Sequence, residues 1–373
     1  MVAMAASTYF FLNSFSYHDM NRNNLRGTPG PKDAHGIIKK NDGSSRSLLA
    51  KDLTKVNATE VRANRASFLK PIMMLGQNKN YLDMIPDLGF GSMLSDGFVF
   101  RQNFQIRSYE VGSDQAVTIE TLMNLLQETS INHLKATGVW GGGSGLTREM
   151  CKIKNLIWVM SKLQVAVDRY PIWDDVIQID TWKGAYGKIG ICSNWTICDA
   201  KTGEILLTAS CIWLMMNEET RRLSKFPDEV RSELDEHLTN VTLPVVARKW
   251  SPRDEMSIVD HVRNGIMPRW SDLDMNQHLN NVKYIGWILE SVPHSIVENY
   301  ELASLTLEYH QECKMESVVQ SHTYVMVSNN GKIGDYDLVD CKHALQLETG
   351  GSEIMRGWSI WRPKQYGNRL GLE

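Results

Sequence analysis

The chain has 373 residues, of which 42% are hydrophobic and 22% are charged, and its formal net charge is -3. This length allows two folded domains, and the composition fits a soluble globular enzyme. The charge argues against a general nucleic-acid binder, because such proteins need a concentrated basic surface. The apolar stretch at residues 205–216 contains polar residues and falls short of the ~20 apolar residues that a membrane-spanning helix requires. We therefore expect neither nucleic-acid binding nor a transmembrane segment.

Residues 1–55 combine small and hydroxylated residues with a later basic stretch rich in Gly, Asn and Ser. Such a composition cannot bury a core. It favours an organelle transit peptide over a secretory signal, since no basic region precedes the apolar run at residues 9–12. A disordered tail without a targeting role is the alternative. Residues 56–96 contain Pro71, Pro86 and several glycines, so we predict that they form a linker to the folded part.

An internal repeat follows. Four pairs of segments recur in the same order: LLQET at residues 125–129 with WILES at 287–291, VIQIDT at 176–181 with VVQSHT at 318–323, GKIG at 187–190 and again at 331–334, and GEI at 203–205 with SEI at 352–354. A duplicated unit constrains the fold more strongly than local propensity does. The sequence therefore predicts two similar domains.

Each copy begins with apolar residues spaced as on one face of a helix: Leu122, Leu125, Leu126 and Ile131 in the first, and Val282, Ile285, Ile288, Leu289 and Val292 in the second. Alternating apolar and polar residues then predict antiparallel strands, as at residues 177–182 and 324–327. A long helix wrapped by an antiparallel sheet is called a hot dog. We therefore predict an α+β fold of tandem hot-dog domains at residues 97–235 and 262–365, with a polar linker at 236–261 and a tail at 366–373.

The second copy contains a polar cluster just before its helix. In an extended segment Asp274, Asn276 and His278 point to the same side. His278 can move a proton near neutral pH, Asn276 can hold a water molecule or a carbonyl, and Asp274 can orient the others. The helix that we expect after Asn280 would add backbone N–H groups for an oxyanion. The alternative is structural: the polar residues cap the helix and His278 packs.

The first copy lacks these residues. Aligned on the shared helix, His278 corresponds to Ala116, Asp274 to Gly112 and Asn276 to Asp114. Aligned on the shared strand, Glu312 and Cys313 correspond to Tyr170 and Pro171. We therefore expect one catalytic centre, in the second copy, and a role in binding for the first.

Several strings resemble plant acyl-acyl-carrier-protein (acyl-ACP) thioesterases over residues 98–363: RSYEVG at 107–112, NLIWV at 155–159, RYP at 169–171, MMN at 215–217, TRRL at 220–223 and DLDMNQHLNN at 272–281, which runs into VKYIGW. The strings FRQNF at 100–104 and EMCK at 149–152 look like the class B branch, which favours saturated chains. The resemblance implies a hydrolase of the plastid stroma that cleaves the thioester of fatty acyl-ACP and so ends chain growth. A hot-dog hydroxyacyl dehydratase and a non-catalytic acyl- or ACP-binding module are the alternatives.

The resemblance also implies which residues act. By matching positions, Asp274, Asn276, His278, Glu312 and Cys313 correspond to the residues implicated in catalysis. In one scheme Cys313 is a nucleophile with His278 as its base; in the other Glu312 activates water. Neighbouring residues of a strand face opposite ways, so both should not enter the site. We favour Glu312, because Cys313 continues an apolar strand face and is expected to be a buried structural thiol.

No metal, nucleotide or other cofactor is expected, because the sequence has no phosphate-binding loop and its histidines share no ligand spacing. The six cysteines lack C-x-x-C spacing, which favours reduced thiols.

The expected partner is the acyl carrier protein, and a homodimer is compatible with this interpretation. Two departures from the family pattern, at residues 192–194 and 310–311, replace basic residues, and either would weaken carrier docking or alter local folding.

Overall fold

The computed structural model describes residues 91–142, 146–153, 155–187, 190–241, 243, 261–274, 278–333 and 336–364. The predicted transit peptide at 1–55, most of the predicted linker at 56–96 and the predicted tail at 366–373 lie outside these residues. Within the described part, no helix is long and apolar enough to cross a membrane.

One large antiparallel sheet runs through both copies, and its strand order is β1-β2-β6-β7-β8-β5-β11-β14-β13-β12-β10. The first copy contributes β1 (Ser92–Met93), β2 (Phe100–Gln105), β5 (Leu156–Val167), β6 (Val176–Tyr186), β7 (Gly190–Asp199) and β8 (Ile205–Asn217). The second contributes β10 (His261–Ile266), β11 (Tyr300–Tyr309), β12 (Val319–Ile333), β13 (Tyr336–Leu347) and β14 (Glu353–Pro363). The order from β2 to β5 is repeated in reverse from β11 to β10, so the repeat seen in the sequence is also a repeat in space.

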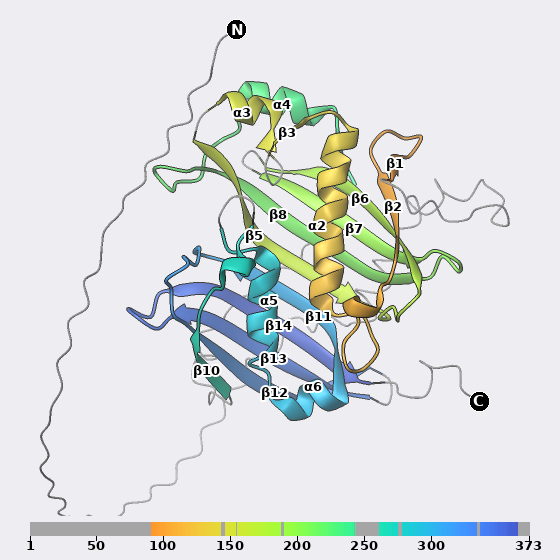
Figure 1. The fold of residues 1–373 in the computed structure, drawn as a ribbon, viewed down its shortest axis with the longest axis vertical. Helices are drawn as coiled ribbons and strands as arrows, with labels where there is room; N and C mark the ends of the chain where they lie inside the picture. Colours follow the sequence, from red (N-terminus) through yellow and green to blue (C-terminus); the bar gives the residue numbers. More distant parts are fainter. Residues whose placement is uncertain are drawn as a thin grey trace, which may run out of the picture. The chain divides into compact units, whose positions relative to one another are not determined.

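Short strands complete the sheets. Strand β9 (Leu238–Thr239) pairs in parallel with β6, within the range expected to be a linker. Strands β3 (Trp140–Gly142) and β4 (Leu146–Thr147) form a separate hairpin. This hairpin lies beside the first helix described below, at one end of the first copy (Figure 1).

A helix lies across the sheet in each copy, α2 (Ile119–Ala136) in the first and α5 (Asn281–Leu289) in the second (Figure 1). Helix α2 begins where the Thr118 side chain accepts a hydrogen bond from the Thr121 backbone N–H, and its apolar face is buried. Helix α6 (His294–Asn299) follows α5, and α3 (Arg148–Lys152) and α4 (Asp228–Asp235) cover one end of the first copy. Short 3-10 helices at Ser108–Glu110 and Trp270–Asp272 precede α2 and α5. The predicted α+β tandem hot-dog fold is confirmed.

The two copies meet along strands β5 and β11, which pair antiparallel from Ser304↔Ala166 to Glu308↔Lys162. Two side chains reinforce this seam. Tyr170 Oη donates to the Leu302 carbonyl at 2.9 Å, and Arg362 Nη1 donates to the Val167 carbonyl at 2.8 Å. One hydrophobic core continues across the seam, with buried residues from α2, α5 and both halves of the sheet. The copies therefore form a single folded body.

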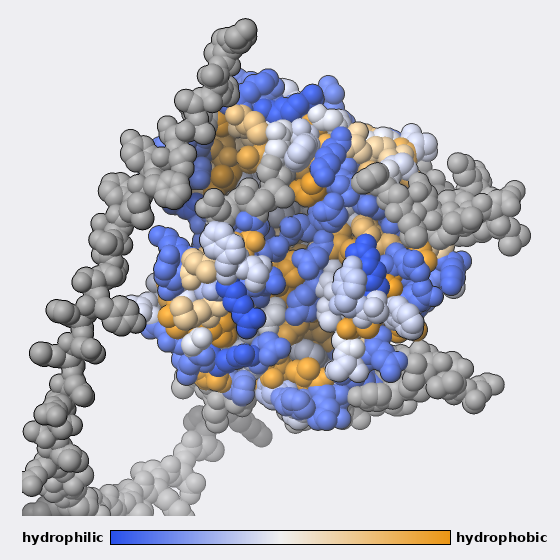
Figure 2. All heavy atoms as spheres, viewed as in Figure 1, coloured by the Kyte–Doolittle hydropathy of each residue, from blue (hydrophilic) through white to orange (hydrophobic). Residues whose placement is uncertain are grey.

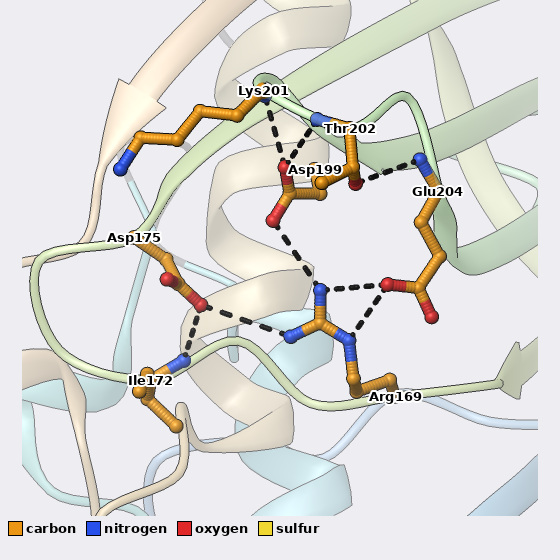
Figure 3. A network of polar contacts seen from close by, with 7 residues as sticks. All are labelled: Arg169, Ile172, Asp175, Asp199, Lys201, Thr202 and Glu204. Atoms are coloured by element: carbon orange, nitrogen blue, oxygen red, sulfur yellow. Dashed lines mark hydrogen bonds and ion pairs between the residues drawn. The ribbon is translucent and has the colours of Figure 1, made fainter. Parts of the chain in front are cut away.

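An arginine fixes two loops of the first copy. Arg169 binds Asp199 and Glu204 at one turn and Asp175 at another, as Figure 3 shows. Asp175 also accepts a hydrogen bond from the Ile172 backbone N–H. These contacts hold the chain that leaves β5 at the point where Tyr170 reaches across the seam.

Candidate active site

A tight loop before α5 positions the predicted polar cluster. Residues Leu273 and Leu279 form an isolated antiparallel bridge. Within the loop, the Asp274 backbone N–H donates to the His278 carbonyl at 2.7 Å, and the His278 N–H donates to Asp274 Oδ1 at 3.1 Å. Asp274 therefore fixes the loop that carries His278. Asn276 lies outside the described residues.

The start of α5 lies at the same place. Asn280 is the N-cap, and its side chain accepts a hydrogen bond from the Val282 N–H at 2.9 Å. The Lys283 N–H donates to the Asn280 carbonyl. The predicted helix start is confirmed, but these two amides are already used, so the predicted oxyanion role would fall on other groups of this first turn.

Glu312 faces His278. Its Oε1 lies 3.1 Å from His278 Nδ1. The prediction that both Glu312 and Cys313 lie on a strand is wrong, because β11 ends at Tyr309. The strand ends there since the N–H groups of His310 and Gln311 both donate to the Ile354 carbonyl, which breaks the regular ladder.

Arg221 also binds Glu312, through an ion pair between its Nη2 and Glu312 Oε2. It comes from the first copy, in the turn after β8, where its φ of 55° is unusual for a residue other than glycine. The sequence analysis did not assign it a role. Its only signal was its place in the TRRL string at residues 220–223. The Glu312 carboxylate is thus held by a histidine from one copy and an arginine from the other.

Cys313 points elsewhere. Its side chain is buried, its N–H donates to Tyr284 Oη at 3.0 Å, and its Sγ approaches the Lys314 carbonyl at 3.6 Å. Burial raises the pKa of this thiol, an effect that a hydrogen bond with Ser317 partly opposes. Cys313 is not among the described residues that line the cavity beside Glu312.

That cavity has a volume of about 1280 Å³ and extends from Glu312 and His278 into the first copy. Its walls are mostly apolar side chains of α2, β5 and β8, with further residues from α3 and the β3–β4 hairpin. Figure 2 shows hydrophobic side chains gathered beside α3 and β3 on an otherwise mostly hydrophilic face. A long apolar space that ends at a His–Glu pair suits a substrate with a hydrocarbon chain and one reactive group.

The two departures from the family pattern lie in different surroundings. Cys192, Ser193 and Asn194 are all buried in β7, so a change there acts inside the fold and the alternative of a lost docking surface is wrong for them. His310 lies at the cavity and pairs with Glu353, with His310 Nδ1 2.7 Å from Glu353 Oε1.

Among the described residues, no group of three or more His, Cys, Asp or Glu side chains is arranged to hold a metal ion. All six cysteines are free thiols, and only Cys151 is exposed.

Comparisons with known proteins show the family of this chain. The family described as "Acyl-ACP thioesterase N-terminal domain" matches residues 97–234, and "Acyl-ACP thioesterase C-terminal domain" matches residues 256–363. The chain is 52% identical over 299 residues to the "Palmitoyl-acyl carrier protein thioesterase, chloroplastic" of Gossypium hirsutum, which covers 79% of this chain and 71% of that protein. It is 50% identical over 302 residues to the "Acyl-[acyl-carrier-protein] hydrolase FATB2, chloroplastic" of Cuphea viscosissima, covering 80% of this chain and 71% of that protein.

A solved structure is also similar. The 12:0-ACP thioesterase from Umbellularia californica superposes with a TM-score of 0.67 at 41% identity, covering 75% of this chain and 100% of that chain. The predicted resemblance is confirmed, including its class B aspect, since one of these relatives is named FATB2. The chain belongs to the acyl-ACP thioesterase family.

Proposed function

We propose that this chain hydrolyses the thioester of fatty acyl-ACP, releasing a free fatty acid and the carrier, with Glu312 and His278 as its catalytic pair. One observation carries the proposal: the pair, with Glu312 Oε1 3.1 Å from His278 Nδ1, lies at a cavity of about 1280 Å³ with mostly apolar walls. The relatives that match the chain over more than two thirds of their length are named for the same reaction.

The reaction follows from the positions of the two side chains. Glu312 accepts a proton from a water molecule, and the resulting hydroxide adds to the thioester carbonyl carbon. With a proton on both ring nitrogens, His278 donates through Nδ1 to Glu312 and through Nε2 to the oxygen that becomes negative. The C–S bond then breaks, and the carrier thiolate takes the proton back from Glu312. All atoms of water appear in the products, and no cofactor takes part.

Asp274 and Asn276 support this chemistry. Asp274 holds the His278 loop through its backbone N–H, which donates to the His278 carbonyl, and its Oδ1, which accepts from the His278 N–H. Asn276, two residues before His278, is assigned to the water or the substrate carbonyl on the basis of its residue type. Cys313 has a structural role in this scheme, because a buried thiol with a raised pKa is a poor source of the thiolate that a nucleophile must supply.

The first copy contributes the space for the acyl chain. Most of the described lining residues belong to it, whereas the His–Glu pair belongs to the second copy. The domain assignment of residues 97–235 to acyl binding and 262–365 to catalysis rests on this division. The protein acts in the plastid, in line with its relatives, which are named chloroplastic. We place it in the stroma, with residues 1–55 as the transit peptide.

The test is an assay of the full chain with saturated acyl-ACPs of increasing length. We expect release of free fatty acid and carrier thiol, with full activity after treatment with a chelator. Conversion of hydroxyacyl-ACP to enoyl-ACP would indicate a dehydratase instead, and tight acyl-ACP binding without release would indicate a binding module. The homodimer stays a prediction, which light scattering of the purified chain would test.

A further inference from the structure

A buried lysine lines the cavity. Lys183 of β6 lines the same cavity as Glu312, with its side chain facing α2. The sheet order β11-β5-β8-β7-β6 separates Lys183 from the strand that leads to Glu312 by four strand spacings, or about 19 Å. An acyl chain whose thioester lies at Glu312 can therefore extend to Lys183 within the same cavity.

Lys183 is 4% exposed, and its ammonium contacts only hydroxyl groups among the described residues. Its Nζ donates to Ser130 Oγ of α2 at 2.9 Å and to Ser193 Oγ of β7 at 3.4 Å. No described Asp or Glu forms an ion pair with it. Because an ammonium group has three donors and a buried charge normally has an anionic partner, Lys183 has an unused capacity for an acceptor.

The nearest ionisable thiols do not supply that anion. Cys211 lies opposite Ser193 on the neighbouring strand and is completely buried. Burial raises the pKa of the Cys211 thiol, so it stays neutral at physiological pH. Burial likewise raises the pKa of Cys192, although hydrogen bonds with Ser210 and Asn194 and the nearby Lys183 charge partly oppose this.

Trp195 supplies a second donor at the same place. It lines the cavity, is 4% exposed, and its Nε1–H has no hydrogen-bond partner among the described residues. Strand pairing places it on the same face as Lys183, because Thr181 pairs with Trp195 and Lys183 pairs with Ser193. Such diagonal neighbours are ~7–8 Å apart. The ammonium, with one of its three donors unused, and the indole N–H, which has no partner among the described residues, therefore lie on one face of the sheet beside the same cavity.

We propose that this polar part of the cavity wall, formed by Lys183, Ser130, Ser193 and Trp195, binds a carboxylate at the distal end of the acyl chain, so that the enzyme accepts ω-carboxyacyl-ACP as a substrate. The inference rests on the proposed function, because it requires the thioester to lie at Glu312. A carboxylate satisfies both donors and neutralises the ammonium. A methyl end group would satisfy neither.

Binding of matched probes tests the inference without turnover. The probes are the monomethyl ester of a long dicarboxylic acid and the methyl ester of the monocarboxylic acid of equal length, titrated calorimetrically into the full chain. Their ester ends are identical, so only the distal group differs. We expect the carboxylate probe to bind about tenfold more tightly or better, as for a charge-assisted hydrogen bond.

Lys183→Met should abolish or reverse this preference, and Trp195→Phe should reduce it. Lys162→Met is the matched control, because Lys162 is also buried but pairs with Glu308 and is not among the described lining residues. Equal binding of both probes by the unmodified protein would overturn the inference, even if Lys183→Met fails to fold. Equal weakening of both probes in a folded Lys183→Met variant would also overturn it, since that result indicates a purely structural lysine.

Turnover separates this inference from the function on which it rests. If the plain acyl-ACP is cleaved and the ω-carboxyacyl-ACP is cleaved no better, while the probes bind equally, the inference fails and the thioesterase function stands. If neither thioester is cleaved but the carboxylate probe is preferred, the polar part of the cavity wall around Lys183 is a real binding site and the proposed reaction is wrong.

Discussion

The two copies build the same backbone turn before their helices. In the first copy the Gly112 N–H donates to the Ala116 carbonyl at 2.8 Å, and in the second the Asp274 N–H donates to the His278 carbonyl at 2.7 Å. The bridges Val111↔Val117 and Leu273↔Leu279 flank these bonds. Each turn follows a 3-10 helix and ends at a polar N-cap. The alignment of the copies that the sequence suggested therefore also holds in space.

What differs is the side chains on that shared backbone. Where the second copy has Asp274 and His278, the first has Gly112 and Ala116, neither of which can move a proton. Where Glu312 is the third residue after β11, the third after β5 is Tyr170, which is buried and bonds to the Leu302 carbonyl. The second copy thus has His278 and Glu312 at these two positions, whereas the first has Ala116 and a tyrosine that holds the copies together.

The helices of the two copies differ in length. Helix α2 of the first copy has 18 residues, whereas α5 of the second has nine. The longer helix provides one wall of the cavity. Under the proposed function, the first copy therefore supplies most of the cavity wall and the second supplies the catalytic pair.

The largest expected effect concerns the reactive pair. Glu312→Ala and His278→Ala should each lower kcat by about two to four powers of ten, the range for a positioned acid or base. Cys313→Ala is the control within the same loop. It should leave kcat nearly unchanged and lower the free energy of unfolding by about 1 kcal/mol, because it removes one buried atom.

Steady-state kinetics and mass spectrometry of the quenched enzyme distinguish the two schemes. An acyl group on Cys313 that forms and decays at the turnover rate would refute the role of Glu312. Loss of turnover in Cys313→Ala, with Glu312→Ala remaining active, would do the same.

Much of this site was predictable, and the part that was not has a physical reason. Periodicity and the repeat placed both helices and most of the strands correctly, because these signals are local and occur twice. They extended two elements too far: α5 ends at Leu289, before Val292, and β11 ends at Tyr309, before Glu312. The pairing of His278 with Glu312 followed only from the family resemblance. Its geometry depends on where β11 ends, and this end is decided by two amides sharing the Ile354 carbonyl, a contact between distant segments.

Arg221 and Lys183 show two kinds of limit. Arg221 reaches Glu312 only because the copies associate, and nothing near residue 221 reports that contact. The burial of Lys183 could have been predicted from the sequence, since strand alternation places it on the same face as Ile177 and Ile179, which are completely buried. A lysine is normally assigned to the surface. The residue type therefore argued for exposure, although the alternation indicated burial.

The second effect concerns the charge buried in the first copy. Burial lowers the pKa of Lys183 from 10.5 to about 8. The unfolded chain therefore holds more protons than the folded chain between pH 8 and 10.5, so this residue makes stability rise with pH in that window. The gain is at most about 3 kcal/mol, at 1.36 kcal/mol for each pKa unit.

Urea denaturation at several pH values, compared between the unmodified chain and Lys183→Met, measures this difference. The variant should lack the alkaline rise, whereas the control Lys162→Met should retain it. Parallel pH profiles for the unmodified chain and Lys183→Met would mean that Lys183 is not buried as a charge.

The third effect concerns Arg221, the residue of the first copy that binds Glu312. Arg221→Ala should lower kcat about tenfold with little change in KM, because it releases one oxygen of Glu312. Arg221→Lys should recover part of the loss, since it keeps the charge without the planar fork. The exposed neighbour Arg222 is the control, and Arg222→Ala should not change kcat. A change in KM alone for Arg221→Ala would instead indicate a role in carrier binding.

The smallest effect concerns the seam. Tyr170→Phe removes the hydroxyl that donates to the Leu302 carbonyl at 2.9 Å and should lower the free energy of unfolding by about 1 kcal/mol. Tyr309→Phe is the matched change in the second copy, where the hydroxyl reaches the Asn281 carbonyl at only 3.4 Å, so its effect should be smaller. Because Tyr170 occupies the position equivalent to Glu312 and takes no part in the reaction, kcat of Tyr170→Phe should stay unchanged. A marked fall in kcat without a fall in stability would show that the first copy's turn also acts on the substrate, and the division of labour between the copies would then be wrong.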